Sequence, residues 1–192
     1  MRLLAAPGRE LAEHVARAAA REPRWSDVLG ALSAPTAIVG AAVAFGYADT
    51  LLAVHFVGNV LLLAASFAIQ SFAAALVGRV LYRRSARATL LPFALTLVTH
   101  EVFFVGVTVL VVVLPLKVGA ALGLLLAVAC MAWNMFLTYA LFRAFDGVAP
   151  ERGTARRLRA IVGVLLHFGI IAVVVGIYMR AQDLLPYPPG RP

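Results

Sequence analysis

A histidine and a glutamate stand side by side within a long apolar stretch of this 192-residue chain. They are His100 and Glu101, in the segment LTLVTHEVFFVG. An imidazole and a carboxyl can exchange a proton, form hydrogen bonds or bind a metal ion, and both are costly to leave unpaired in apolar surroundings. Glu101 is fourteen residues after Arg87 and sixteen before Lys117, so on a helix it lies about 20 Å from either charge.

Three more hydrogen-bonding side chains lie at comparable places in other apolar stretches. Each is eight or nine residues from an arginine at the end of its stretch, which is about 12–14 Å on a helix. These residues are Gln70, Asn134 and His167. With His100 and Glu101 they form a candidate polar cluster. We expect Glu101 to face protein and to have a polar partner within hydrogen-bond reach, with His167 and Asn134 favoured by their depth. A protonated Glu101 that is hydrogen-bonded to His100 or His167 would fit the low dielectric, which raises the pKa of a carboxyl. His100, about 100° away round the helix, should contact a different neighbour.

A secondary polar stripe runs along the stretch that contains Gln70. His55, Asn59 and Ser66 fall with Gln70 within about 60° of arc at helical spacing. We expect this stripe to face other helices, because polar side chains in membrane helices mostly point into the bundle.

Two interpretations of the polar residues stay open. Buried polar side chains often only join helices, at about 0.6 kcal/mol each, and this suits Gln70, Asn134 and His167. Glu101 is harder to explain by packing, because a charged side chain near mid-membrane costs about 2.5–3.5 kcal/mol and a neutral one would pack better. A functional or partner-binding role therefore stands beside the structural one for Glu101.

Other site chemistries have little support. Three histidines and a glutamate could bind a metal ion, but His55 lies near the opposite surface from His167, so they cannot all meet. His100 and His167 could ligate a haem, although no further haem pattern is present. The loops GYAD and DGVAPERG lack the glycine–lysine pattern of a phosphate site. We expect no catalytic residue, no metal and no cofactor.

The elements that carry these residues are five apolar runs. The chain is 62% hydrophobic and only 14% charged, which is typical of membrane proteins. A spanning helix needs about 20 apolar residues. The runs are Val28–Tyr47, Leu51–Val80, Leu90–Leu116, Val118–Phe142 and Leu158–Met179. The sequence therefore predicts an all-α polytopic membrane protein with a bundle of five transmembrane helices.

The basic residues predict the orientation of the bundle. Fourteen of the seventeen flank the runs on one side: the N-terminal segment and the connections after the second and fourth runs. Cytoplasmic loops favour Lys and Arg, so we expect an inner-membrane protein with its N-terminus cytoplasmic and its C-terminus external. The net charge of +8 follows from this pattern, and we expect no nucleic-acid partner. The arginine clusters could instead hold anionic lipid headgroups.

The ends of the chain differ from the bundle. We divide the chain into a cytoplasmic amphipathic segment (1–27), the five-span bundle (28–180) and a proline-rich external tail (181–192). Leu11, Val15 and Ala18 share one face of the first segment at helical spacing, which predicts an amphipathic interfacial helix before the bundle.

The layout resembles the bacterial form of the Ypt-interacting-protein (Yip) family of five-span membrane proteins. The resemblance rests on the segments REPRWSDVLGALSAPTAIVG, GRVLYRRSARATLLP and CMAWNMFLTYALFRAFDGV. The acidic, tyrosine-containing motif of eukaryotic members is not found in this sequence, and the family has no established catalytic residues to carry over. The resemblance thus implies a non-enzymatic bundle.

The sequence leads to one main functional expectation and two rivals. We expect a non-enzymatic, Yip-like scaffold or assembly subunit of the inner membrane. Its partners would be membrane lipids, other membrane subunits or further copies of the chain. The first rival is a transporter or proton-handling subunit that uses the polar layer around Glu101. The second is a haem-binding electron-transfer subunit.

Overall fold

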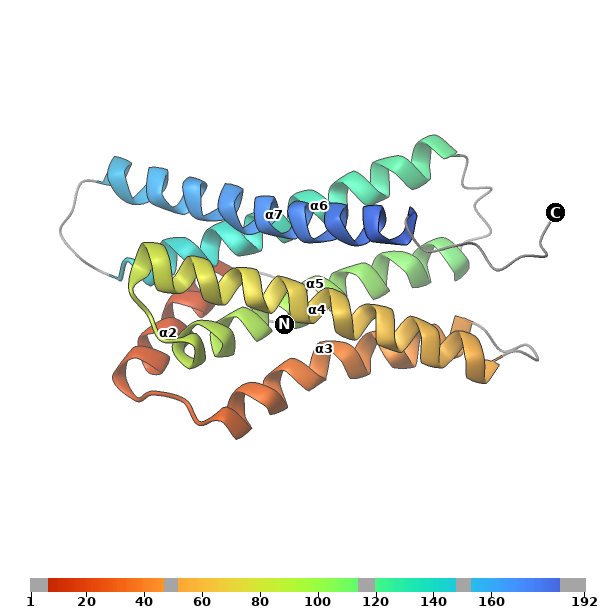
Figure 1. Cartoon of the computed structure of the whole chain (residues 1–192), viewed down its shortest axis with the longest axis horizontal. Helices are drawn as coiled ribbons and strands as arrows, with labels where there is room; N and C mark the ends of the chain where they lie inside the picture. The colour runs from red at the N-terminus through yellow and green to blue at the C-terminus, as the bar shows by residue number, and fades with distance from the viewer. Residues whose placement is uncertain (1–6, 47–51, 114–119, 148–152, 184–192) are drawn as a thin grey trace.

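The chain folds into α-helices, as a computed structural model shows (Figure 1). The structure describes residues 7–46, 52–113, 120–147 and 153–183. Within these ranges there are helices and turns and no strand. The helices are α2 (Pro7–Ala20), α3 (Trp25–Gly46), α4 (Leu52–Tyr82), α5 (Ala86–Val113), α6 (Ala120–Phe145) and α7 (Gly153–Asp183). The predicted all-α class is confirmed.

Four of these helices are long and apolar enough to cross a membrane. The qualifying segments are Ala64–Tyr82, Ala86–Gly106, Leu124–Phe145 and Gly153–Ile177. The chain therefore has the composition and element lengths of an integral membrane protein. The first predicted run falls on α3, which is helical for 22 residues. Many side chains of α3 lie outside the described residues, so the count of five spans stays a prediction.

The long helices pack side by side as an elongated bundle (Figure 1). α5 contacts α3, α4 and α6, and α7 lies against both α4 and α6. α3 packs on α4 and α5, and the shorter α2 packs on α5 and α6 near one end of the bundle.

Identifiable caps begin and end the helices. The Ser85 hydroxyl accepts a hydrogen bond from the Ala88 amide and so caps the start of α5. A carboxylate oxygen of Asp27 accepts one from the Arg24 amide at the start of α3. α4 ends before Arg83, whose φ of 53° is unusual for a residue other than glycine. α6 ends before Gly147, which has a φ of 61° and suits this conformation.

Two glycines allow helices to approach closely. A Cβ atom at Gly163 on α7 would lie 2.9 Å from Cδ2 of Phe142 on α6. One at Gly78 on α4 would overlap the side chain of Thr89 on α5. Small residues at such crossings let the helix backbones approach closely. The van der Waals contacts that result help to hold helices together in lipid.

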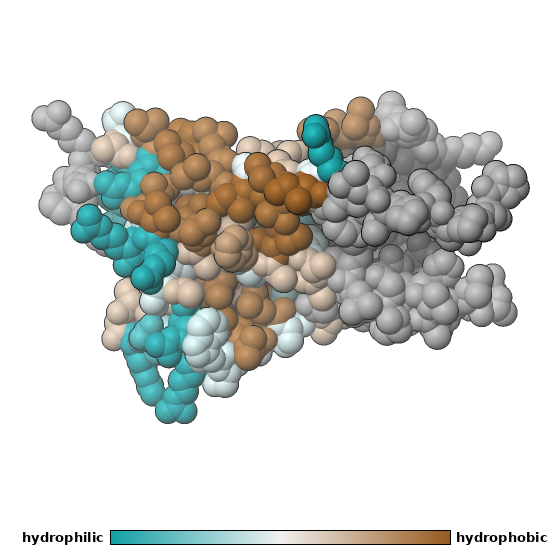
Figure 2. Space-filling view, in the orientation of Figure 1, coloured by the Kyte–Doolittle hydropathy of each residue, from teal (hydrophilic) through white to brown (hydrophobic). Residues whose placement is uncertain are grey.

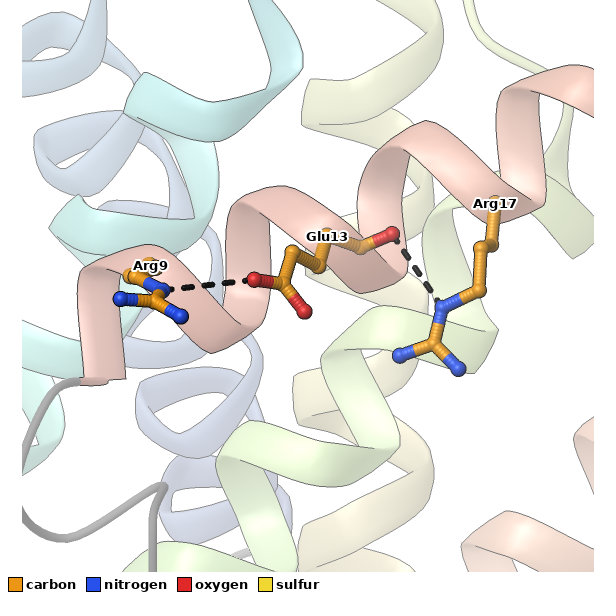
Figure 3. Close-up of polar contacts among 3 residues, drawn as sticks. All are labelled: Arg9, Glu13 and Arg17. Carbon is orange, nitrogen blue, oxygen red and sulfur yellow. Dashed lines mark hydrogen bonds and ion pairs between the residues drawn. The ribbon is translucent and has the colours of Figure 1, made fainter.

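The core lies at the end of the bundle where α2 packs. Leu11 and Val15 of α2 join Phe93, Leu97 and Phe142 in one buried cluster. The apolar face of α2 is therefore covered by α5 and α6. The outer face of α2 carries a row of polar contacts, in which Arg9 pairs with Glu13 and Arg17 donates to the Glu13 carbonyl (Figure 3).

The surface divides along the length of the bundle. Hydrophilic residues gather at one end, and large apolar side chains cover the middle (Figure 2). Leu124 on α6 and Leu165 on α7 are 67% and 63% exposed, far more than a water-soluble surface of this extent would carry. Such an apolar belt is what the hydrocarbon core of a bilayer requires.

Candidate functional site

Glu101 points into the protein, as the sequence predicts. It is 6% exposed, whereas its neighbours on α5, Val102 and Phe104, are 43% and 44% exposed. The His100 imidazole lies beside it, with Nε2 3.9 Å from Glu101 Oε1. That separation is within ion-pair range and beyond a hydrogen bond. Nδ1 of His100 is buried and makes no hydrogen bond.

The predicted partners of these two residues are wrong. Glu101 forms no hydrogen bond with His167 or Asn134, and the ring nitrogens of His167 have no hydrogen-bond partner among the described residues. His100, expected to contact a different neighbour, instead lies next to the Glu101 carboxyl. The flexible side chains of residues i and i+1 can turn toward each other although their Cβ atoms point about 100° apart.

His167 sits in an aromatic pocket. It is fully buried, and its ring centroid lies 5.6 Å from that of Phe93, 6.1 Å from Phe142 and 5.1 Å from Phe168. All three rings meet the imidazole at steep angles, so its N–H can point at a π face, a weak substitute for a hydrogen bond. α5, α6 and α7 each supply part of this pocket.

The aromatic pocket does not fit the haem hypothesis. An axial ligand needs an open approach to one ring nitrogen for a flat macrocycle. Phe93, Phe142 and Phe168 occupy the space around His167 instead. Among the described residues, no three His, Cys, Asp or Glu side chains come together in a way that could hold a metal ion.

The secondary stripe is described only at one end. Nε2 of Gln70 donates to Ser66 Oγ at 3.3 Å, and both residues lie on α4. Gln70 is half-buried, Ser66 is exposed, and Oε1 of Gln70 is buried without a partner. The side chains of His55 and Asn59 lie outside the described residues, so the full stripe stays a prediction.

Asn134 and its neighbours on α6 form local contacts. Asn134 is half-buried, and its backbone carbonyl accepts a hydrogen bond from Thr138 Oγ1 at 2.9 Å. Trp133, the preceding residue, lies between Phe103 and Phe136 at centroid distances of 5.5 and 5.6 Å. Apart from the neighbours His100 and Glu101, the residues of the candidate polar cluster therefore have different surroundings.

Two ion pairs that join different elements lie at the hydrophilic end of the bundle. Asp146 Oδ1 accepts a hydrogen bond from Arg159 at 2.7 Å, which ties the end of α6 to α7. Arg87 pairs with Glu22 at 2.9 Å and links α5 to the segment before α3.

Arg84 has a central place at this end. It donates to the Phe145 carbonyl at 3.1 Å and stacks over the Phe145 ring at 4.9 Å. Burial lowers the pKa of the Arg84 guanidinium, and the nearby Asp146 carboxylate opposes that shift. In the sequence, Arg84 is one of the basic residues after the second apolar run that predict the orientation. Its position directly after an apolar run was the one feature of the sequence that could have predicted a contact between Arg84 and the end of another helix.

Comparison with known proteins adds no assignment. No protein-family model matches the chain, and no curated protein or solved structure matches it significantly. The function is therefore argued from the fold and the side chains.

Proposed function

We propose that this chain is a five-span inner-membrane protein of Yip-like type that acts as a non-enzymatic scaffold or assembly subunit. One observation carries the proposal. Apart from the neighbours His100 and Glu101, the described side chains that could do chemistry have separate surroundings, whereas most of the hydrophilic residues in the described part of the chain gather at one end (Figure 2). An enzyme or a proton path needs such groups to converge or to form a connected chain.

The distribution of charge supports the proposed orientation. Arg79, Arg84, Arg143 and Arg159 lie at the ends of α4, α6 and α7 that meet at the hydrophilic end of the bundle (Figure 1). By the positive-inside rule this end is cytoplasmic, so α2 is cytoplasmic too. With α3 as the first span, the chain crosses the membrane five times.

The sequence predicts α2 as an interfacial helix before the bundle, whereas its apolar face packs on the bundle itself. Its apolar residues Leu11 and Val15 are buried in the core cluster with α4, α5 and α6. We infer a helix that lies at the membrane surface and uses its apolar face to close the cytoplasmic end of the bundle. Its exposed outer row, with Arg9 and Arg17, then faces water or a protein partner (Figure 3).

A proton-handling role is the second candidate, because His100 and Glu101 lie 3.9 Å apart and are both largely buried. Such a pair could take up and release a proton if water reached it. The separate placement of His167 and Gln70 argues against a continuous path through the bundle.

Proton flux into liposomes separates the two candidates. The purified protein is reconstituted with a potassium gradient and an internal pH-sensitive dye, and valinomycin starts the experiment. The scaffold proposal predicts acidification no faster than in protein-free liposomes. Faster acidification that Glu101→Gln removes would overturn the scaffold proposal and establish proton handling.

A second measurement tests the scaffold role itself. The protein is cross-linked in its own membrane and then extracted in mild detergent. A scaffold or assembly subunit should give a discrete species above the 20.4 kDa of one chain. A protein that remains monomeric at every cross-linker concentration would contradict the proposal.

A further inference from the structure

A groove opens between α2 and the second half of α6, at the hydrophilic end of the bundle. Its volume is about 540 Å³, within the range of small-molecule sites. Its α2 wall is made of small side chains, among them Ala12, Ala16 and Ala19, all of them exposed. Its α6 wall carries the aromatic rings of Phe136 and Tyr139. Because alanine side chains are small, the α2 wall does not fill the groove.

The rim of the groove is positively charged. Arg84, Arg143 and Arg156 line it, and no aspartate or glutamate is among the described residues of its lining. Acidic side chains nearby are paired elsewhere: Asp146 with Arg159 on α7, and Glu13 with Arg9 on the outer row of α2 (Figure 3). An anion in the groove would therefore meet Arg84 and Arg143, with no carboxylate among the described residues of the lining.

Arg84 is prepared to bind an anion. Its hydrogen bond to the Phe145 carbonyl and its contact with the Phe145 ring hold the guanidinium in place. A guanidinium has five N–H donors, so one bond to a carbonyl leaves capacity for phosphate oxygens. A side chain that is already ordered loses little further entropy when it binds.

The groove runs from the headgroup region toward the hydrocarbon. Arg143 and Phe136 are seven residues apart on α6, which is about 10 Å along the helix. Arg143 lies two residues from the end of the apolar segment Leu124–Phe145, at the hydrophilic end of the bundle, and Phe136 lies deeper in that segment. Tyr139 lies between them, at the level where tyrosines commonly meet the membrane interface. Charge at one end and apolar walls at the other match an anion with a hydrocarbon chain attached.

We propose that this groove binds one anionic phospholipid from the leaflet at the basic end, with its phosphate at Arg84 and Arg143 and the start of an acyl chain along the alanine wall of α2. The bound lipid would fill the space between α2 and α6 and hold α2 on the bundle. The inference needs only the placement of the bundle in a membrane, and it does not depend on the scaffold role.

Native mass spectrometry of the full chain in mild detergent tests the proposal. Phosphatidylglycerol and phosphatidylethanolamine, which differ in net charge and share their acyl chains, are titrated separately. We expect one phosphatidylglycerol to bind several-fold more tightly than phosphatidylethanolamine. Arg143→Gln should weaken phosphatidylglycerol binding about fivefold, the effect of losing one basic residue near the phosphate. Arg143→Lys should keep most of the binding.

Matched control variants distinguish lipid binding at the groove from general electrostatic attraction of the lipid to the basic end of the protein. Arg79 is exposed at the same end of the bundle and does not line the groove, so Arg79→Gln should leave binding unchanged. Ala16→Leu should fill the groove and reduce binding without changing the charge. Ala172→Leu, at an exposed position on α7 away from the groove, should have no effect. All four positions are exposed, so these variants should fold, which thermal unfolding checks.

Three outcomes would overturn the proposal. Equal binding of the two lipids would remove the anion selectivity. An equal loss in Arg79→Gln and Arg143→Gln would reduce the effect to overall charge. Full displacement of phosphatidylglycerol by inorganic phosphate at equal concentration would show a phosphate site that makes no use of the acyl chain. None of these results bears on proton flux or on oligomeric state, so the scaffold proposal is tested separately.

Discussion

Replacing Gly163 with alanine should weaken the contact between α6 and α7. The new methyl group would lie 2.9 Å from Cδ2 and 3.3 Å from Cγ of the Phe142 ring, closer than atoms normally pack. Phe142 cannot easily move away, because it is fully buried and its ring lies 5.8 Å from those of Tyr82 and Phe145. Inserting a methyl group into such packing costs about 1–3 kcal/mol.

Gly169→Ala is the matched control on the same helix. A Cβ atom at Gly169 would meet nothing within 4 Å. Both substitutions change helix propensity by the same amount, about 1 kcal/mol in favour of alanine. The difference between the two variants therefore isolates the contact with Phe142. We expect Gly163→Ala to have the lower free energy of unfolding by about 1–3 kcal/mol.

Reversible unfolding in mixed micelles, followed by circular dichroism, gives the two free energies. A second substitution, Phe142→Leu, should relieve the clash, so the double variant should be more stable than the sum of the single effects predicts. Equal stability of Gly163→Ala and Gly169→Ala would refute the close packing of α7 on Phe142. Additive effects in the double variant would refute the assignment of the cost to this ring.

Three further predictions concern single side chains. Glu101→Leu should leave stability unchanged or raised, since the carboxyl makes no hydrogen bond with the described residues, whereas a loss of about 1–3 kcal/mol would reveal a buried partner. Arg83→Gly should raise the free energy of unfolding by about 1 kcal/mol, because φ is 53° at this position, and a decrease would contradict the strained turn. Burial, then Arg17, lowers the pKa of His14 from 6.5, and Glu10 and Glu13 oppose this. As the pH falls, His14 is therefore protonated in the unfolded chain before it is protonated in the folded chain. The contribution of His14 to stability is full above pH 6.5 and is lost as the pH drops through the lower pKa that His14 has in the folded protein. Hydrogen exchange of α2 at pH 7.5 and pH 5 should show this loss, and His14→Gln should abolish it.

The helical architecture is largely predictable from the sequence. Runs of about 20 apolar residues leave helices as the only way to satisfy the backbone in a membrane. The inward direction of Glu101 follows from the cost of placing a carboxyl against lipid. The burial of Leu11 and Val15 follows from their spacing, although the sequence alone did not show that other helices, and not lipid, cover them.

The contacts within the candidate site were not predictable. Depth along a helix is uncertain by two to four residues, or about 3–6 Å, which exceeds the reach of a hydrogen bond. His167 illustrates the consequence, because phenylalanines from α5, α6 and α7 surround it. Phenylalanines are common in apolar runs and gave no signal that they would form a pocket. The groove beside α2 was equally hidden, since it depends on how a short helix docks onto α6.

The topology tests the account most directly. Reporter fusions placed after Arg84 and Arg152 should read as cytoplasmic, and fusions after Asp49, Val118 and Pro189 should read as external. This pattern requires α3 to be a span and the basic end of the bundle to face the cytoplasm. An external reading after Arg152, or a cytoplasmic reading after Asp49, would contradict the five-span arrangement and the cytoplasmic placement of α2.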